Sequence, residues 1–172
     1  LKDLSTDHVY KFWDHGSREL TTLPFDYEKT LFVCHYAIPT RLLTQDFLKE
    51  FHIKTIFYNP SDLKTLEKNI TTKTKLIFVE NPGSNSFEFQ DLGKIISIAK
   101  KNKILTAIAN TWATPYYFKP IKFGFDMSIV SATKYYSGHS DVMGGSLAVN
   151  KKVFNKVKVT EKITGLRLGP DD

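Results

Sequence analysis

Short apolar runs alternate with amphipathic stretches along most of the chain. The apolar runs are suited to buried strands, and they cover residues 31–34, 53–58, 75–80, 104–109, 126–131 and 146–149. Between them, apolar residues recur at helical spacing, which predicts helices that begin near Pro39, Pro60-Ser61, Asp91 and Lys152. Strands that alternate with helices form right-handed βαβ units. The predicted fold class is therefore α/β, with three layers: a mainly parallel sheet flanked by helices on both faces.

The alternation begins only at about residue 31. Residues 1–30 are polar and contain aromatic side chains without a regular period, so they are predicted to form an irregular N-terminal segment. Residues 31–172 are enough for one domain with a hydrophobic core.

Composition narrows the range of functions. Hydrophobic residues make up 41% and charged residues 24% of the chain, which is typical of a globular domain. The net charge is +6, but the lysines are scattered along the whole chain, which favours a solvated surface over a nucleic-acid partner. No apolar run approaches the roughly 20 residues that span a bilayer, so no membrane partner is expected. A single cysteine and isolated histidines predict no metal site.

The segment with the richest chemistry follows the strand predicted at 126–131. It places Ser131, Thr133 and Lys134 in a loop at a strand end, where α/β folds bind their ligands. Hydroxyl groups can bind a phosphate, and a lysine amine can form a Schiff base with an aldehyde. On residue type alone, Lys134 is more simply one of 24 lysines and arginines on the surface.

The residues on either side of Lys134 favour a functional role over that of an ordinary surface lysine. Ser131-Ala-Thr-Lys134-Tyr, followed by Gly138-His-Ser-Asp141, resembles the lysine signature of the pyridoxal-phosphate (PLP) enzymes of Cys/Met metabolism, the trans-sulfuration family. Asn110-Thr-Trp-Ala-Thr-Pro115 and Glu80-Asn-Pro-Gly-Ser84 resemble two further family motifs, in the right order. The last two motifs are most similar to the cystathionine β-lyase branch. The resemblance implies part of the large domain of a fold-type I PLP enzyme.

The resemblance also implies roles for single residues. Lys134 would hold PLP and move the substrate proton, Ser131 and Thr133 would bind the cofactor phosphate, and Tyr36 would stack on the pyridine ring and assist in proton transfer. Lys134 and Tyr36 are thus the predicted catalytic residues. The implied reaction is α,β-elimination of the sulfur amino acid L-cystathionine to homocysteine, pyruvate and ammonia, in methionine biosynthesis. The implied setting is a cytoplasmic homo-oligomer.

Two departures from the family leave alternatives open. Ala109 occupies the place of the family's aspartate, which pairs with the pyridine nitrogen. Asn110 is a poor substitute, because neighbouring strand residues point to opposite faces. The family's C-terminal small domain, with its carboxylate-binding arginine, is expected to be absent, so 31–172 would be a partial large domain. The chain is therefore either a cystathionine β-lyase-like enzyme or a catalytically impaired remnant, such as a pseudogene product. A basic binding module is the remaining alternative.

Overall fold

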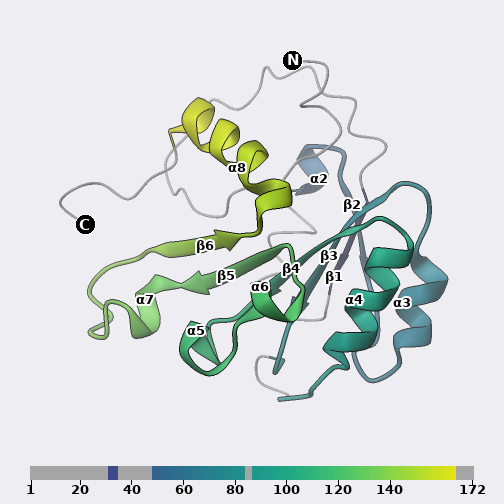
Figure 1. The fold of residues 1–172 in the computed structure, drawn as a ribbon, viewed down its shortest axis with the longest axis horizontal. Helices are drawn as coiled ribbons and strands as arrows, with labels where there is room; N and C mark the ends of the chain where they lie inside the picture. Colours follow the sequence, from purple (N-terminus) through teal and green to yellow (C-terminus); the bar gives the residue numbers. More distant parts are fainter. Residues whose placement is uncertain (1–30, 35–47, 84–86, 166–172) are drawn as a thin grey trace.

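The computed structural model describes residues 31–34, 48–83 and 87–165, and only the backbone of 31–34. Six strands form one sheet in the order β2-β1-β3-β4-β5-β6 (Figure 1). Their bounds are β1 (Leu31–Cys34), β2 (Lys54–Phe57), β3 (Thr74–Glu80), β4 (Leu105–Ala109), β5 (Met127–Ser131) and β6 (Gly145–Val149). The pairs from β2 to β5 are parallel, and β6 is antiparallel to β5. The predicted α/β class and mainly parallel sheet are confirmed.

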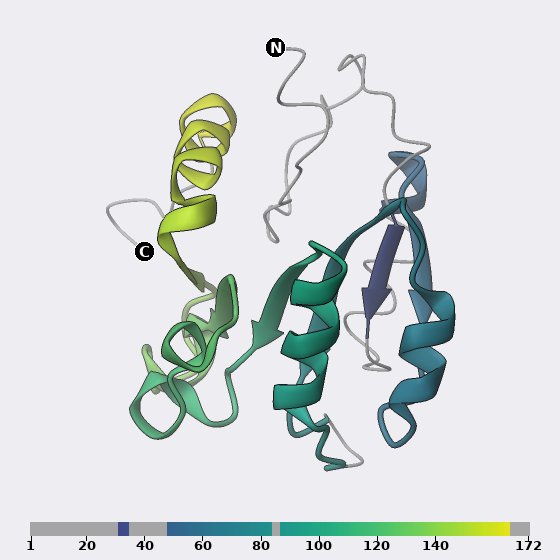
Figure 2. The ribbon, with the colours of Figure 1, turned by 45° about the vertical axis from the view of Figure 1, so that its right-hand side comes forward.

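Helices cover both faces of this sheet. They are α2 (Leu48–Glu50), α3 (Leu63–Asn69), α4 (Leu92–Lys101), α5 (Thr114–Tyr117), α6 (Pro120–Phe123), α7 (Ala132–Tyr135) and α8 (Lys151–Thr164). Figure 2 shows α3 and α4 side by side, and both pack on one face of the sheet, whereas α8 packs with α2 on the other face. The sequence pattern missed α5, α6 and α7, because four residues are too few to show a helical period. The helix predicted to begin near Pro39 falls mostly outside the described residues.

Side-chain caps set where two helices begin. Asp91 is the N-cap of α4, as predicted, and its Oδ1 accepts a hydrogen bond from the Lys94 N–H at 2.9 Å. The start predicted for α3 is one residue too early. Asp62 is the N-cap of α3, whereas the Ser61 N–H donates to Asn59 Oδ1 at 2.9 Å in the preceding turn. An aspartate next to a serine can take the capping position, and the turn at Asn59 decides which of them does.

Two apolar clusters fill the space between the sheet and its helices. The first joins α3 and α4 to the strand residues Ile77, Val79 and Ile108. The second, on the opposite face, joins α2 and α8 to the strand residues Leu76, Phe78, Ala107 and Met127. Alternate residues of β3 therefore enter different clusters, as expected for a central strand that is buried on both faces. This alternation of side chains between the two faces also assigns Glu80, Ala109 and Asn110 to a face of the sheet.

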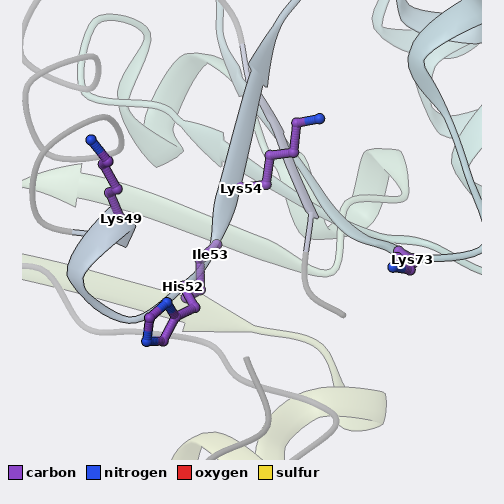
Figure 3. Close-up of a pocket in the computed structure, with 5 residues that line it drawn as sticks. All are labelled: Lys49, His52, Ile53, Lys54 and Lys73. Atoms are coloured by element: carbon purple, nitrogen blue, oxygen red, sulfur yellow. The ribbon is translucent and has the colours of Figure 1, made fainter. Parts of the chain in front are cut away.

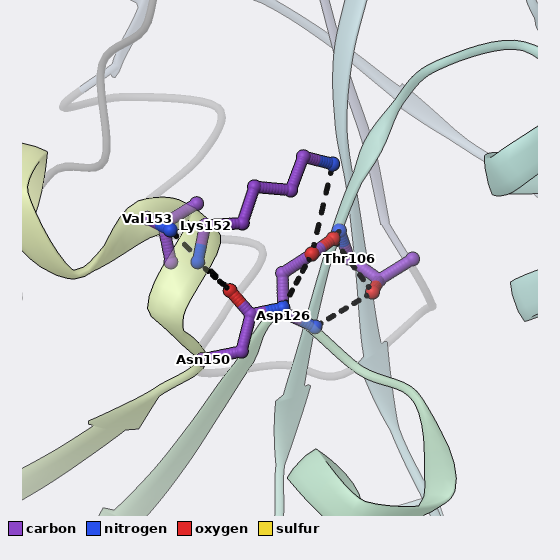
Figure 4. Close-up of polar contacts among 5 residues, drawn as sticks. All are labelled: Thr106, Asp126, Asn150, Lys152 and Val153. Atoms are coloured by element: carbon purple, nitrogen blue, oxygen red, sulfur yellow. Dashed lines mark hydrogen bonds and ion pairs between the residues drawn. The ribbon is translucent and has the colours of Figure 1, made fainter.

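A buried carboxylate ties three elements together at the amino ends of β4 and β5 (Figure 4). Asp126 Oδ2 accepts hydrogen bonds from the Thr106 N–H at 2.9 Å and from the Thr106 hydroxyl at 3.3 Å. Asp126 Oδ1 accepts from the Asn150 side-chain amide at 2.8 Å. Asn150 is also the N-cap of α8. Lys152 reaches Asp126 only at 3.7 Å and is well exposed, so it contributes little.

Replacement of Asp126 by alanine should destabilise the fold strongly. The change leaves the Thr106 N–H, the Thr106 hydroxyl and the Asn150 amide without their acceptor, and each unsatisfied buried donor costs about 1–3 kcal/mol. Urea unfolding followed by circular dichroism measures the free energy of unfolding. Lys152→Ala is the control and should cost less than about 1 kcal/mol. Equal small losses in both variants would show that the network does not stabilise the fold.

Candidate functional site

The carboxyl ends of three parallel strands lie next to one another at one edge of the sheet. The β3–β4 register pairs Glu80 with Ala109, and the β4–β5 register pairs Ala109 with Ile129. Ser131, two residues further along β5, ends that strand opposite Gly145 of β6. The residues that the sequence motifs single out are thus brought to a common edge, where α/β folds bind ligands.

Ser131 links the end of β5 to the segment that follows β4. Its N–H donates to the Thr111 hydroxyl at 2.9 Å. The Asn110 N–H, one residue earlier, donates to the Ile129 carbonyl at 2.7 Å. The Ser131 side chain is half-buried, and within the described residues its hydroxyl makes no hydrogen bond. Ser131 therefore offers a hydroxyl that is available to a ligand at the strand end.

The lysine segment is a short helix, and the prediction of a loop there is wrong. Ala132–Tyr135 forms α7, and the Gly138 N–H donates to the Lys134 carbonyl at 2.9 Å. No glycine or proline interrupts this stretch before Gly138, whose φ of 76° suits a glycine and reverses the chain. Lys134 is exposed at the end of α7, and its ammonium has no partner among the described residues. The amine is therefore accessible to a ligand.

Thr133 is fixed by the strand that follows. Its hydroxyl accepts a hydrogen bond from the Gly144 N–H at 3.0 Å and donates to the Gly144 carbonyl at 3.3 Å. The Ala132 N–H donates to the same carbonyl at 2.8 Å. The single hydroxyl proton of Thr133 is thus directed at the backbone. This contact holds α7 against the start of β6, and a phosphate-binding role for Thr133 stays a prediction.

Ala109 and Asn110 point to opposite faces, as the alternation of strand residues predicts. Ala109 packs against the cluster formed with α2 and α8. The Asn110 side-chain amide donates to the Phe118 carbonyl at 3.1 Å, and Phe118 packs against the other cluster. Asn110 is fully buried, and its Oδ1 atom has no hydrogen-bond partner among the described residues. The Asn110 amide therefore points to the α5–α6 side of the sheet. It cannot take the place of an aspartate at position 109, whose side chain would point to the other face.

Gln90 is a site residue that sequence reasoning missed. Its side-chain amide donates to the Glu80 carbonyl at 3.0 Å, and its N–H donates to Asn81 Oδ1 at 2.7 Å. The Tyr58 hydroxyl in turn donates to Gln90 Oε1 at 2.6 Å. A polar residue just before a helix N-cap carries no periodic signal. Only its burial, at 7% exposure, marks it as the residue that holds the end of β3.

The turn after β3 brings the backbone of Gly83 close to the side chain of Glu88. The Gly83 N–H donates to the Glu88 carbonyl at 3.0 Å. A Cβ atom on Gly83 would lie 2.5 Å from Glu88 Oε1, so any other residue would displace that carboxyl group. The Pro82-Gly83 pair of the sequence motif thus has a structural reason in the close approach of Glu88.

These features agree with comparisons to known proteins. Residues 32–172 match the family described as Cys/Met metabolism PLP-dependent enzyme. The chain belongs to this family. A putative cystathionine β-lyase of Saccharomyces cerevisiae is 38% identical over 135 residues, which are 78% of this chain and 40% of that protein. The chain thus spans about two fifths of that relative's length.

Two solved structures of related proteins resemble the fold. Cystathionine γ-lyase from Lactobacillus plantarum, complexed with L-serine, has a TM-score of 0.77 and 29% identity, over 83% of this chain and 38% of its own. A putative O-acetylhomoserine (thiol)-lyase from Campylobacter jejuni has a TM-score of 0.69 and 35% identity, over 75% of this chain and 32% of its own. The latter contains N'-pyridoxyl-lysine-5'-monophosphate. The predicted family, fold type and PLP cofactor are confirmed, while the named relatives differ in reaction.

The donor set of this family member suits one end of PLP and not the other. The exposed amine of Lys134 and the hydroxyl of Ser131, three residues apart, are the groups that an aldehyde and a phosphate require. At the nitrogen end, Ala109 offers only a methyl group. Tyr36, the predicted stacking residue, lies outside the described residues. Arg18, Arg41 and Arg167, which could bind a substrate carboxylate, lie outside them too.

Other side chains near the edge have structural rather than chemical roles. His139 is exposed, and its Nδ1 lies 2.9 Å from the Ser137 carbonyl within the same loop. Asp141 is exposed. Within the part of the chain that the structure describes, no three His, Cys, Asp or Glu side chains are grouped as metal ligands, and no helix is long and apolar enough to span a membrane.

A basic hollow lies at the opposite edge of the sheet. It has a volume of about 490 Å³ and is lined by Lys49, His52, Ile53, Lys54 and Lys73 (Figure 3). Lys54 is the first residue of β2, and Lys73 directly precedes β3, so this is the amino end of the parallel strands. The side chains of Lys49 and Lys54 point away from each other in Figure 3.

Loss of the Thr133 hydroxyl should loosen α7 from β6. Thr133→Val keeps the shape of the side chain but leaves the Gly144 N–H without its acceptor, at a cost of about 1 kcal/mol. Hydrogen exchange followed by NMR should show faster exchange of the Gly144 amide in this variant. Thr133→Ser retains the hydroxyl and is the control. Unchanged exchange in Thr133→Val would contradict the assigned contact.

Proposed function

We propose that this chain is the PLP-binding part of a carbon–sulfur lyase that acts on L-cystathionine by α,β-elimination. The observation that carries the proposal is the common edge of β3, β4 and β5, where β5 ends at Ser131 and the exposed Lys134 follows three residues later in α7. The motif order and the similarity to a putative cystathionine β-lyase support the β-lyase reaction. As the resemblance implies, the reaction would belong to methionine biosynthesis in the cytoplasm.

Each residue has a defined task in this proposal. PLP, when bound, withdraws electrons from the substrate α-carbon. Lys134 would hold the cofactor before the substrate binds. After the substrate amine displaces it, the free Lys134 amine would accept the proton from the α-carbon and deliver it to the departing sulfur of homocysteine. The remaining three-carbon fragment reacts with water to give pyruvate and ammonia. The hydroxyl of Ser131 holds the phosphate. Tyr36 covers the ring and Thr133 adds a phosphate contact, as the family resemblance implies.

A second candidate is favoured by one specific observation. Ala109 stands where a carboxylate would keep the pyridine nitrogen protonated, and a methyl group cannot do so. A charged hydrogen bond is worth about 1.5–3 kcal/mol. Its loss would slow the reaction by about 10- to 100-fold. The chain would then be an impaired member of the family rather than an efficient enzyme.

The site edge also carries large exposed aromatic side chains. Trp112 is 61% exposed, Tyr116 81%, Tyr117 83% and Tyr135 61%. Exposed aromatic residues that gather near one edge are typical of surfaces that another chain covers. We therefore include a homo-oligomer in the proposal, as the family resemblance implies.

Lys134 should be the lysine that holds the cofactor. Borohydride reduction of the chain with PLP, followed by peptide mapping, should place the pyridoxyl group on Lys134, because among the described lysines it follows a strand end that carries a free hydroxyl. Lys134→Ala should abolish the label, and the control Lys119→Ala should leave it unchanged. A label on any other lysine would contradict the assignment.

Ala109→Asp should raise elimination activity. A carboxylate at this position supports the protonated nitrogen, so pyruvate release from cystathionine should increase by about tenfold, more in kcat than in KM. Ala109→Asn, which matches the shape without the charge, is the control. Equal rates of pyruvate release by the original chain and by Ala109→Asp, both well above the rate of Lys134→Ala, would contradict the proposal that Ala109 impairs the enzyme.

A further inference from the structure

A carboxylate lies next to the position that Ala109 leaves without one. The two register partners of Ala109 are Glu80 on β3 and Ile129 on β5. Residues paired in a parallel sheet project from the same face, about 4.8 Å apart. Leu76 and Phe78 assign that face of β3 to the cluster that also contains Ala109. Glu80 therefore projects on the same face as the missing aspartate, from the adjacent strand.

Hydrogen bonds fix the backbone at the carboxyl end of β3, where Glu80 is the last residue. Gln90 binds the Glu80 carbonyl through its side chain and Asn81 through its N–H. Tyr58, which is only 3% exposed, fixes Gln90 in turn. These bonds fix the backbone from which the Glu80 side chain projects, and a group that contacts a cofactor requires such a fixed backbone.

The surroundings of Glu80 would strengthen such a contact. Its side chain is half-buried, and the neighbouring residues on its face, Phe78, Ala107 and Ile129, are apolar. A carboxylate interacts more strongly with a cation in apolar surroundings than in water. Glutamate is also one methylene longer than aspartate, which offsets part of the distance between the two strands.

We propose that Glu80 supplies the carboxylate that Ala109 lacks and keeps the pyridine nitrogen of bound PLP protonated. This inference rests on the proposed function, because it assumes that Lys134 holds the cofactor. Glu80 approaches from the adjacent strand and is an imperfect replacement, which agrees with the gain expected for Ala109→Asp.

The test compares four variants of the full chain: Glu80→Gln, Ala109→Asp, the double variant, and the control Glu67→Gln, which removes an exposed charge from α3. Two quantities are measured with ¹⁵N-labelled PLP: its dissociation constant and the NMR chemical shift of the ring nitrogen. Glu80→Gln should weaken binding about tenfold and move the shift toward that of unprotonated pyridine. Glu67→Gln should change neither. In the Ala109→Asp background, Glu80→Gln should change binding by less than about twofold, because the aspartate holds the proton there.

Each outcome decides the proposal. Equal effects of Glu80→Gln and Glu67→Gln, or the same effect of Glu80→Gln with and without Asp at 109, would overturn it. If Glu80→Gln does not fold, the NMR shift of PLP bound to the unchanged chain still tests the proposal. A ring nitrogen that is unprotonated at pH 7 in that chain would overturn it. Absence of PLP binding at Lys134 in the unchanged chain would overturn the proposed function and this inference together. Binding at Lys134 with a ring nitrogen insensitive to Glu80 overturns the inference alone.

Discussion

The carboxylate of Asp126 is the contact on which the site most depends. It bonds to Thr106 at the start of β4 and to Asn150 at the start of α8, so it fixes two strands and a helix relative to one another. Once the amino ends of β4 and β5 are held, the parallel ladder sets the register up to the other ends. That register places Ala109 beside Ile129 and brings Ser131 to the same edge. A buried charge at one end thus positions the chemistry at the other.

The chemistry is concentrated at the carboxyl ends because only there do consecutive parallel strands present their loops together. Ser131 and Lys134 retain groups available to a ligand, whereas Thr133 and Thr111 hold the backbone. In the proposed site, the groups of Lys134 and Ser131 would meet the aldehyde and the phosphate of PLP. At the pyridine nitrogen, the proposed site relies on the carboxylate of Glu80, which lies on the strand next to that of Ala109.

Membership of the Cys/Met-metabolism family establishes the cofactor but not the reaction. The related proteins include a β-lyase, a γ-lyase and a thiol-lyase, which share this part of the fold. This chain spans about two fifths of its yeast relative.

The amino-acid sequence alone determined the α/β class, nearly all the strands and the identity of the family. Buried parallel strands need continuous apolar runs, and a cofactor signature such as that around Lys134 needs specific residues in sequence. Short-range patterns could not predict helix α7, the bonds of Thr133 to Gly144, or the role of Gln90, because each depends on a partner distant in the chain or on burial. Tertiary structure also decided which residue flanks Ala109: strand register, a long-range property, places Glu80 beside it.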